Sequence, residues 1–113
     1  MGRSKDLIIT GGLNVYPKEV EEMLNSLPGI LESAVVGLPD SDFGEAVTAI
    51  VVAEPGGTLD PAEIRRQARE VLAPFKVPKS VHVMESLPRN ALGKVEKARL
   101  REMLAAQSAP KPP

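Results

Sequence analysis

The chain of 113 residues contains no cysteine and no tryptophan, and its aromatic side chains are Tyr16, Phe43 and Phe75 alone. The missing cysteines exclude disulfides, a thiol nucleophile and thiolate metal sites. With His82 as the single histidine, no metal site is expected. Because so few aromatic rings leave no platform on which bases could stack, the core has to be aliphatic and nucleic-acid binding is disfavoured.

Charge and hydropathy give no sign of a polyanionic or membrane partner either. Fourteen Lys and Arg residues stand against fifteen Asp and Glu residues, so no global field attracts nucleic acid or an anionic membrane. No apolar run approaches the roughly 18 residues of a membrane span, and no signal peptide is visible. The sequence therefore predicts one cytoplasmic domain with neither a nucleic-acid nor a membrane partner.

Apolar residues at helical spacing predict two or three helices. The first begins at Pro17, a residue suited to the first helical position, and its acidic residues Glu19 to Glu22 are expected to face solvent. The second begins at Pro61, and a last one contains Leu100. The residues of the second helix that we expect to point inward are Ile64, Ala68, Val71 and Leu72.

The β-branched and alternating stretches predict an α+β fold. Residues 7–9 and 13–15 flank a glycine turn and form the expected N-terminal two-stranded hairpin. Residues 34–38 and 47–52 are apolar on both faces, which favours central strands, and residues 81–84 alternate as an edge or third strand does. We expect a roughly three-stranded antiparallel sheet covered by the helices.

The segment LPRNALGK, residues 87–94, predicts a loose turn that carries one lysine. Pro88 fixes where the loop begins, and Gly93 removes side-chain bulk next to Lys94. The plainest interpretation of Lys94 is a solvated surface residue. The alternative is a lysine that reaches into the cleft of another molecule, where its ammonium stabilises developing phosphate or carboxylate charge.

Two N-terminal segments also admit a structural and a functional interpretation. Thr10-Gly11-Gly12 is either an ordinary hairpin turn or a backbone that lets a thin ligand pass closely, because no Cβ intrudes. It does not match a phosphate-binding loop, since no Gly-Lys-Ser/Thr follows. The charged run with Arg3, Lys5 and Asp6 is either a solvated start or a hinge that absorbs backbone rotation.

The order of these segments resembles the adenylate-forming superfamily of acyl- and aryl-CoA synthetases, peptide-synthetase adenylation domains and luciferases. Gly-Arg-x-Lys-Asp, a Gly-Gly loop and Asn-Val-Tyr-Pro-Lys-Glu-Val-Glu follow one another as in a core motif of that family. Residues 73–79 are similar to the approach to its last motif, and residues 87–94 look like the last motif itself. The resemblance runs from Gly2 to about Leu104, and residues 8–19 look most like bacterial malonyl-CoA synthetases.

This resemblance implies that residues 1–107 are a mobile C-terminal lid domain that starts at the hinge, followed by a disordered proline-rich tail at residues 108–113. The large N-terminal adenylation domain, which holds the acid pocket and most contacts to ATP and Mg²⁺, would be absent. Met1 is therefore expected to be an artificial start, and the fragment alone to be inactive. The implied substrates are ATP, coenzyme A and a small carboxylic acid, with malonate as the first choice.

The resemblance also implies that Lys94 is the catalytic residue of adenylation, in which a carboxylate attacks the α-phosphate of ATP and expels pyrophosphate. Arg3 and Gly93 are assigned to binding the nucleotide. Acetylation of Lys94 by a protein lysine acetyltransferase would remove its charge and is expected to stop this step. Two departures from the family pattern are Arg89, where lysine is common, and Lys97, where an arginine often stands.

For thioester formation, the resemblance implies that the domain swings about a hinge at Lys5 and Asp6. Gly11 and Gly12 would then line the tunnel for the pantetheine arm of coenzyme A. Several alternatives stay open at this point: another acyl- or aryl-CoA ligase, an adenylation domain that loads a carrier protein, a stand-alone binding or regulatory domain, and a domain without a ligand.

Overall fold

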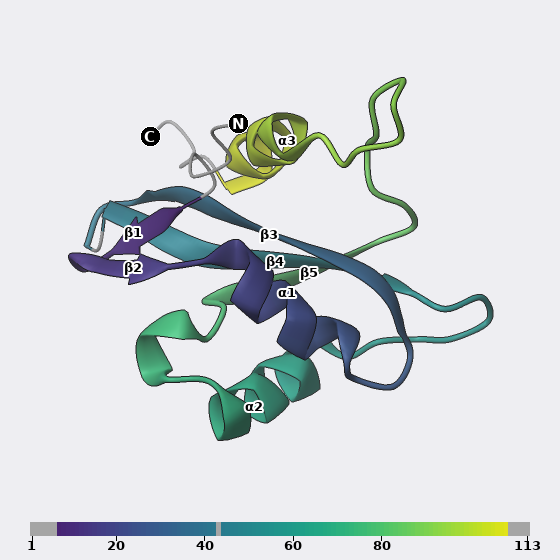
Figure 1. The fold of residues 1–113 in the computed structure, drawn as a ribbon, viewed down its shortest axis with the longest axis horizontal. Helices are drawn as coiled ribbons and strands as arrows, with labels where there is room; N and C mark the ends of the chain where they lie inside the picture. Colours follow the sequence, from purple (N-terminus) through teal and green to yellow (C-terminus); the bar gives the residue numbers. More distant parts are fainter. Residues whose placement is uncertain (1–6, 43, 109–113) are drawn as a thin grey trace.

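The computed structural model describes residues 7–42 and 44–108 and has the α+β fold that the sequence predicts (Figure 1). In chain order its elements are β1 (Ile8–Thr10), β2 (Leu13–Val15), α1 (Pro17–Asn25), β3 (Ile30–Asp40), β4 (Gly44–Ala53), α2 (Pro61–Val71), the 3-10 helix η2 (Pro74–Lys76), β5 (Ser80–Met84) and α3 (Lys97–Ser108). In the described residues, no helix combines the length and hydropathy needed to cross a membrane. The helix α3 extends through Ser108, the first residue of the expected tail, and residues 109–113 lie outside the described part.

The main sheet has the strand order β3-β4-β5 and is mixed rather than antiparallel. The antiparallel pairing of β3 with β4 is confirmed, with Val35 opposite Ala49. The expected antiparallel pairing of the third strand is wrong, because β5 runs parallel to β4, with Ile50 opposite His82. The reason is the connection: α2 carries the chain back to the starting end of β4, and a crossover of this kind delivers a parallel strand.

Strand β3 lies at the edge of the sheet, so its predicted central place is wrong, although β4 is central as expected. Its two faces are apolar because helices cover both of them: α1 packs on one side and α3 on the other (Figure 1). β3 also runs on through Pro39, which pairs with Glu45. A proline is tolerated there because an edge strand has N–H positions that need no partner in the sheet.

Two apolar clusters fill the space between the three layers. The cluster under α1 and α2 includes Leu24, Val35 and Ile64, whereas the cluster under α3 includes Ile50 and Leu100. The hairpin belongs to the first cluster through Ile8 and Val15, which are 1% and 0% exposed. The helix α2 buries Ile64 and Ala68 as predicted, but Val71, in its last turn, is 68% exposed and its predicted inward position is wrong.

A pair of leucine substitutions tests where the core lies. Leu24→Ala, at a side chain with no exposed surface, is expected to lower the free energy of unfolding of the chain by about 2–5 kcal/mol, because it leaves a cavity. The matched change Leu31→Ala, at a residue that is 57% exposed, is expected to cost less than about 0.5 kcal/mol. Urea denaturation measures both values, and equal losses would contradict this assignment.

Candidate functional site

The loop that carries Lys94 connects β5 to α3 and is anchored at both of its stems. Leu87 at its start is buried, and Val95 packs half-buried against the cluster under α3. Arg89 and Val95 form an isolated antiparallel bridge, and the Glu96 N–H donates to the Pro88 carbonyl at 2.9 Å. The loop is therefore a small hairpin that rests on the core.

The tip of this loop is hydrogen-bonded, so the expected loose turn is wrong. The Asn90 side-chain oxygen accepts from the N–H groups of Leu92, at 2.9 Å, and Lys94, at 3.1 Å. The Asn90 backbone N–H donates to the Lys94 carbonyl, and the Gly93 N–H donates to the Asn90 carbonyl. Gly93 has φ of +84° and open space where a Cβ would stand, so glycine is needed there for its backbone conformation.

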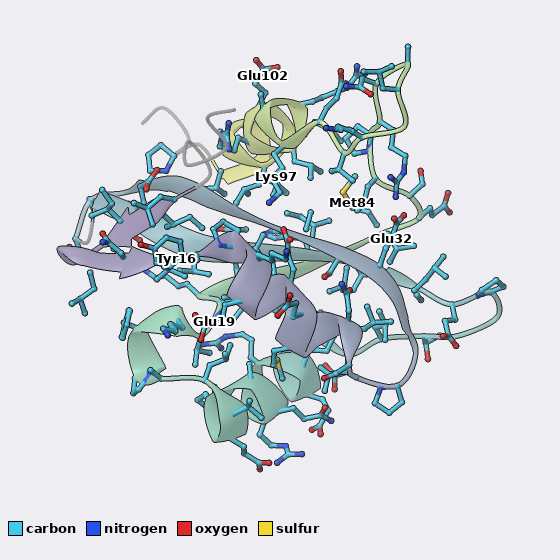
Figure 2. The ribbon with its side chains drawn as sticks, in the orientation of Figure 1. Tyr16, Glu19, Glu32, Met84, Lys97 and Glu102 are labelled. Atoms are coloured by element: carbon cyan, nitrogen blue, oxygen red, sulfur yellow. The ribbon has the colours of Figure 1, made fainter. Side chains whose placement is uncertain are left out.

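Arg89 ties the same loop to the sheet. Its guanidinium donates to the Gly93 carbonyl at 2.9 Å and forms an ion pair with Glu32 of β3. Figure 2 places Glu32 on the side of the sheet below that loop. Because one guanidinium contacts both the loop tip and a strand, it limits how far the tip can move relative to the core.

The side chain of Lys94 extends from this support into solvent. It is exposed, and none of the residues in the described ranges hydrogen-bonds or ion-pairs with its ammonium. Among the described residues, the Lys94 ammonium therefore makes no polar contact, and its charge is accessible to an anion outside the domain.

The residue three positions further along, Lys97, has a different and structural environment. Its ammonium lies 2.7 Å from Glu21 of α1, and both side chains are about four-fifths buried, at 18% and 20% exposure. Glu21 also accepts from the Val35 N–H at 2.9 Å. The prediction that Glu21 faces solvent is wrong, and Lys97 joins the start of α3 to α1 and β3 (Figure 2).

The glycine turn of the first hairpin confirms the predicted hairpin and has both φ angles positive, +59° at Gly11 and +81° at Gly12. This is the conformation that matches the twist of a two-residue hairpin loop. Both residues are exposed, and apart from its chain neighbours no described residue has an atom within 4 Å of a Cβ placed on Gly12. The described residues therefore leave the space around Gly12 open.

A cavity of about 550 Å³ lies beside the turn and was not foreseen from the sequence. Thr10, Gly11 and Leu13 form one side of it, and the ring of Phe75 contributes an apolar wall. The basic residues in its lining are Arg65, Arg69 and Lys79. The i, i+4 spacing of Arg65 and Arg69 could have shown that they share one face of α2. Their position beside the glycine turn, however, depends on tertiary packing.

The cavity cations are partly engaged within the domain. Arg65 donates to the Pro78 carbonyl at 3.0 Å, and the Lys79 ammonium lies 2.7 Å from Asp40, whose side chain is 11% exposed. These contacts fix the direction of the two side chains while their charge still borders the cavity. The arrangement can bind an anionic group that lies against the glycine turn.

The two candidate elements lie at opposite ends of the domain: the Lys94 loop projects beyond α3, and the glycine turn closes the hairpin at the far side of the sheet (Figure 1). A single reaction centre therefore cannot contact both in one orientation of the domain. The remaining predicted residues, Arg3, Lys5 and Asp6, lie outside the described residues.

Asn90 provides a test of the loop geometry. Asn90→Ala removes the acceptor of the Leu92 and Lys94 N–H groups, so we expect amide hydrogen exchange at these two positions to become about fivefold faster for each lost bond. Asn90→Asp keeps an oxygen acceptor at the same place and is the matched control. NMR-detected exchange of the chain measures this, and unchanged rates in Asn90→Ala would contradict the assigned bonds.

Known proteins of related sequence cover nearly the whole chain. Residues 19–94 match the family model of the AMP-binding enzyme C-terminal domain. A methyl-dioxo-octahydroindenyl-propanoyl:CoA ligase of Mycobacterium tuberculosis is 52% identical over 101 residues, which are 89% of this chain and 20% of that protein. The indoleacetate–CoA ligase of Aromatoleum aromaticum is 44% identical over 107 residues, 95% of this chain and 21% of that protein. The chain thus spans about a fifth of the length of these relatives.

Solved structures agree in fold as well as in sequence. Apo MatB from Rhodopseudomonas palustris matches with a TM-score of 0.89 at 52% identity, over 94% of this chain and 21% of that chain. ATP-bound MatB from the same organism matches with a TM-score of 0.87 at 53% identity, over 90% of this chain and 20% of that chain. The chain therefore belongs to the AMP-binding enzyme C-terminal domain family of the adenylate-forming superfamily.

Proposed function

We propose that the chain is the C-terminal domain of an ATP-dependent, AMP-forming acid–CoA ligase and works against a large N-terminal adenylation domain outside this sequence. The observation that carries the proposal is the placement of an ordered, outward lysine at one end of the domain and a glycine turn beside a basic cavity at the other. Two half-reactions served by two orientations of one domain require two such ends. The ligase names of the relatives support the same class.

In the first half-reaction, a substrate carboxylate oxygen attacks the α-phosphorus of ATP, and the bond to pyrophosphate breaks. Negative charge concentrates on the oxygens between the two reactants. The Lys94 ammonium, delivered by its braced loop, stabilises this charge more in the transition state than in the ground state. Arg3 is assigned to the nucleotide nearby, and Mg²⁺ to the N-terminal domain.

In the second half-reaction, the domain turns about Lys5 and Asp6 so that the glycine turn replaces Lys94 at the reaction centre. The thiol of coenzyme A attacks the acyl carbonyl, and AMP leaves. The cavity fits this substrate, because Gly11 and Gly12 present no side chain to a thin pantetheine arm and the neighbouring cations suit its phosphates.

Malonate is the acid that we place first. The support is the 52–53% identity to MatB, a malonyl-CoA synthetase. Relatives of similar identity carry other acids in their names, such as indoleacetate and long-chain fatty acids. An acid pocket in the N-terminal domain selects among them, so malonate is to be compared with these acids in the assay of the full enzyme.

Substitution of the lysine separates the two half-reactions. In the full-length enzyme, Lys94→Ala is expected to slow pyrophosphate release from ATP and acid by about 10²–10³-fold, as does the loss of one oxyanion donor. Thioester formation from ready-made acyl-adenylate is expected to stay near the wild-type rate. Enzyme acetylated at Lys94 is expected to behave in the same way, because the ammonium charge is lost.

Lys18→Ala, at an exposed lysine of α1, is the matched control and is expected to change neither rate. The 113-residue chain alone is expected to release no pyrophosphate, because it lacks the ATP pocket. Normal pyrophosphate release by Lys94→Ala or by the acetylated enzyme would refute the role of Lys94.

Substitution in the glycine turn is expected to have the opposite selectivity. Gly12→Ala adds a methyl group where the described residues offer no obstruction, so the expected clash is with the incoming arm. We therefore expect thioester formation to slow by roughly tenfold or more while pyrophosphate release is spared. The positive φ also adds strain of about 1–3 kcal/mol to the turn, and this effect needs its own control.

Gly56→Ala is the matched control for this strain. Gly56 has φ of +78° and equally open surroundings in a turn after β4, away from the cavity. It is expected to lower stability as Gly12→Ala does and to leave both half-reactions unchanged. Equal kinetic effects of the two substitutions would show that only the strain matters.

A further inference from the structure

In the part of the chain that the structure describes, one hydrogen bond joins the glycine hairpin to the main sheet. The Ile9 N–H of β1 donates to the Glu45 carboxylate of β4 at 2.8 Å. The other anchors of the hairpin are the apolar side chains of Ile8 and Val15 in the core cluster. Apolar burial is non-directional and tolerates small rotations and shifts, whereas a hydrogen bond to a carboxylate fixes distance and direction.

The register of the hairpin explains why this donor is open. Residues of an antiparallel ladder alternate between pairs that exchange hydrogen bonds and pairs that do not. Thr10 and Leu13 flank the two-residue turn, and Ile9 stands opposite Asn14. The Ile9 N–H therefore points away from β2, toward the outer edge of the hairpin, where Glu45 accepts its hydrogen.

The path of the Glu45 side chain is cleared by a glycine. A Cβ at Gly37 of β3 would lie 3.1 Å from the Glu45 carboxyl carbon and one of its oxygens, and 3.2 Å from Cγ1 of Ile8. The φ of Gly37 does not lie in the left-handed region, so its backbone does not demand glycine. The absent side chain leaves room for the carboxylate and for Ile8 together.

The contact is next to residues that line the cavity beside the turn. Thr10, which follows Ile9 in β1, and Ala46, which follows Glu45 in β4, both belong to the lining. The bond between Ile9 and Glu45 therefore ties the strand that leads into the glycine turn to the strand that continues into the cavity lining. A change in its length or direction alters the separation between the glycine turn and the wall that faces it.

The geometry points to Glu45 as a positioning residue for thioester formation, which acts through the glycine turn and not by contact with substrate. This inference rests on the proposed function. The Lys94 loop is held by other groups, the Arg89–Glu32 pair and the Asn90 side chain. Loss of the Glu45 contact therefore affects the second half-reaction and spares the first.

The test uses the full-length enzyme, with malonate as the acid and ready-made malonyl-adenylate for the second half-reaction. Glu45→Ala is expected to slow thioester formation about tenfold and to change pyrophosphate release less than twofold. Glu45→Gln keeps an amide oxygen that accepts from the Ile9 N–H, so it is expected to recover most of the lost rate. Gly37→Ala, which displaces the carboxylate without removing it, is expected to act like Glu45→Ala.

Glu22→Ala, which removes an exposed carboxylate from α1, is the control and is expected to leave both rates unchanged. Equal losses in both half-reactions of Glu45→Ala would mean a general structural role and overturn the inference, and so would unchanged rates in both. Lys94→Ala and Gly12→Ala are measured alongside. If these two also fail to separate the half-reactions, the proposed function itself is wrong; if they separate them and Glu45→Ala does not, only the inference about Glu45 fails.

Discussion

The constraint on which the rest of the structure depends is that β3 and β4 are apolar on both faces and both faces have to be removed from water. Residues that alternate along the pair point to opposite sides, Val35 into the cluster with Leu24 and Ile50 into the cluster with Leu100. One helical layer cannot cover two faces. The chain therefore places α1 and α2 on one side and α3 on the other.

This three-layer arrangement separates the two candidate elements, the glycine turn and the Lys94 loop. The segment that precedes α1 becomes the glycine hairpin, and the segment that precedes α3 becomes the Lys94 loop, so the two emerge at different ends of the sheet. Each is fixed by its own polar contacts, Glu45 to Ile9 in one case and Arg89 to Glu32 in the other. Rigid elements at separate ends are what a domain needs if it is to turn as one body between two tasks.

Local sequence patterns predicted which elements form better than they predicted which elements lie next to one another in space. The hairpin, the helix from Pro17 and the loop with Lys94 each depend on turn residues and periodicity, which act over a few positions. The parallel strand β5 depends on how α2 packs, and the solvent-side prediction for Glu21 failed because Lys97, far along the chain, comes to meet it. The basic cavity was missed for the same reason: Lys79 and α2 reach the glycine turn only in the folded domain.

The burial of the second apolar face by α3 has a consequence for folding during synthesis. All residues of the cluster that contains Val35 precede α3 in the chain, whereas Ile50 and its neighbours are covered only once Leu100 and Leu104 have been synthesised. On the ribosome, the nascent sheet therefore exposes one complete apolar face until α3 has left the exit tunnel. Exposed apolar surface of this kind makes a folding intermediate prone to aggregation, so a chain truncated before α3 is expected to aggregate rather than to form a smaller folded domain.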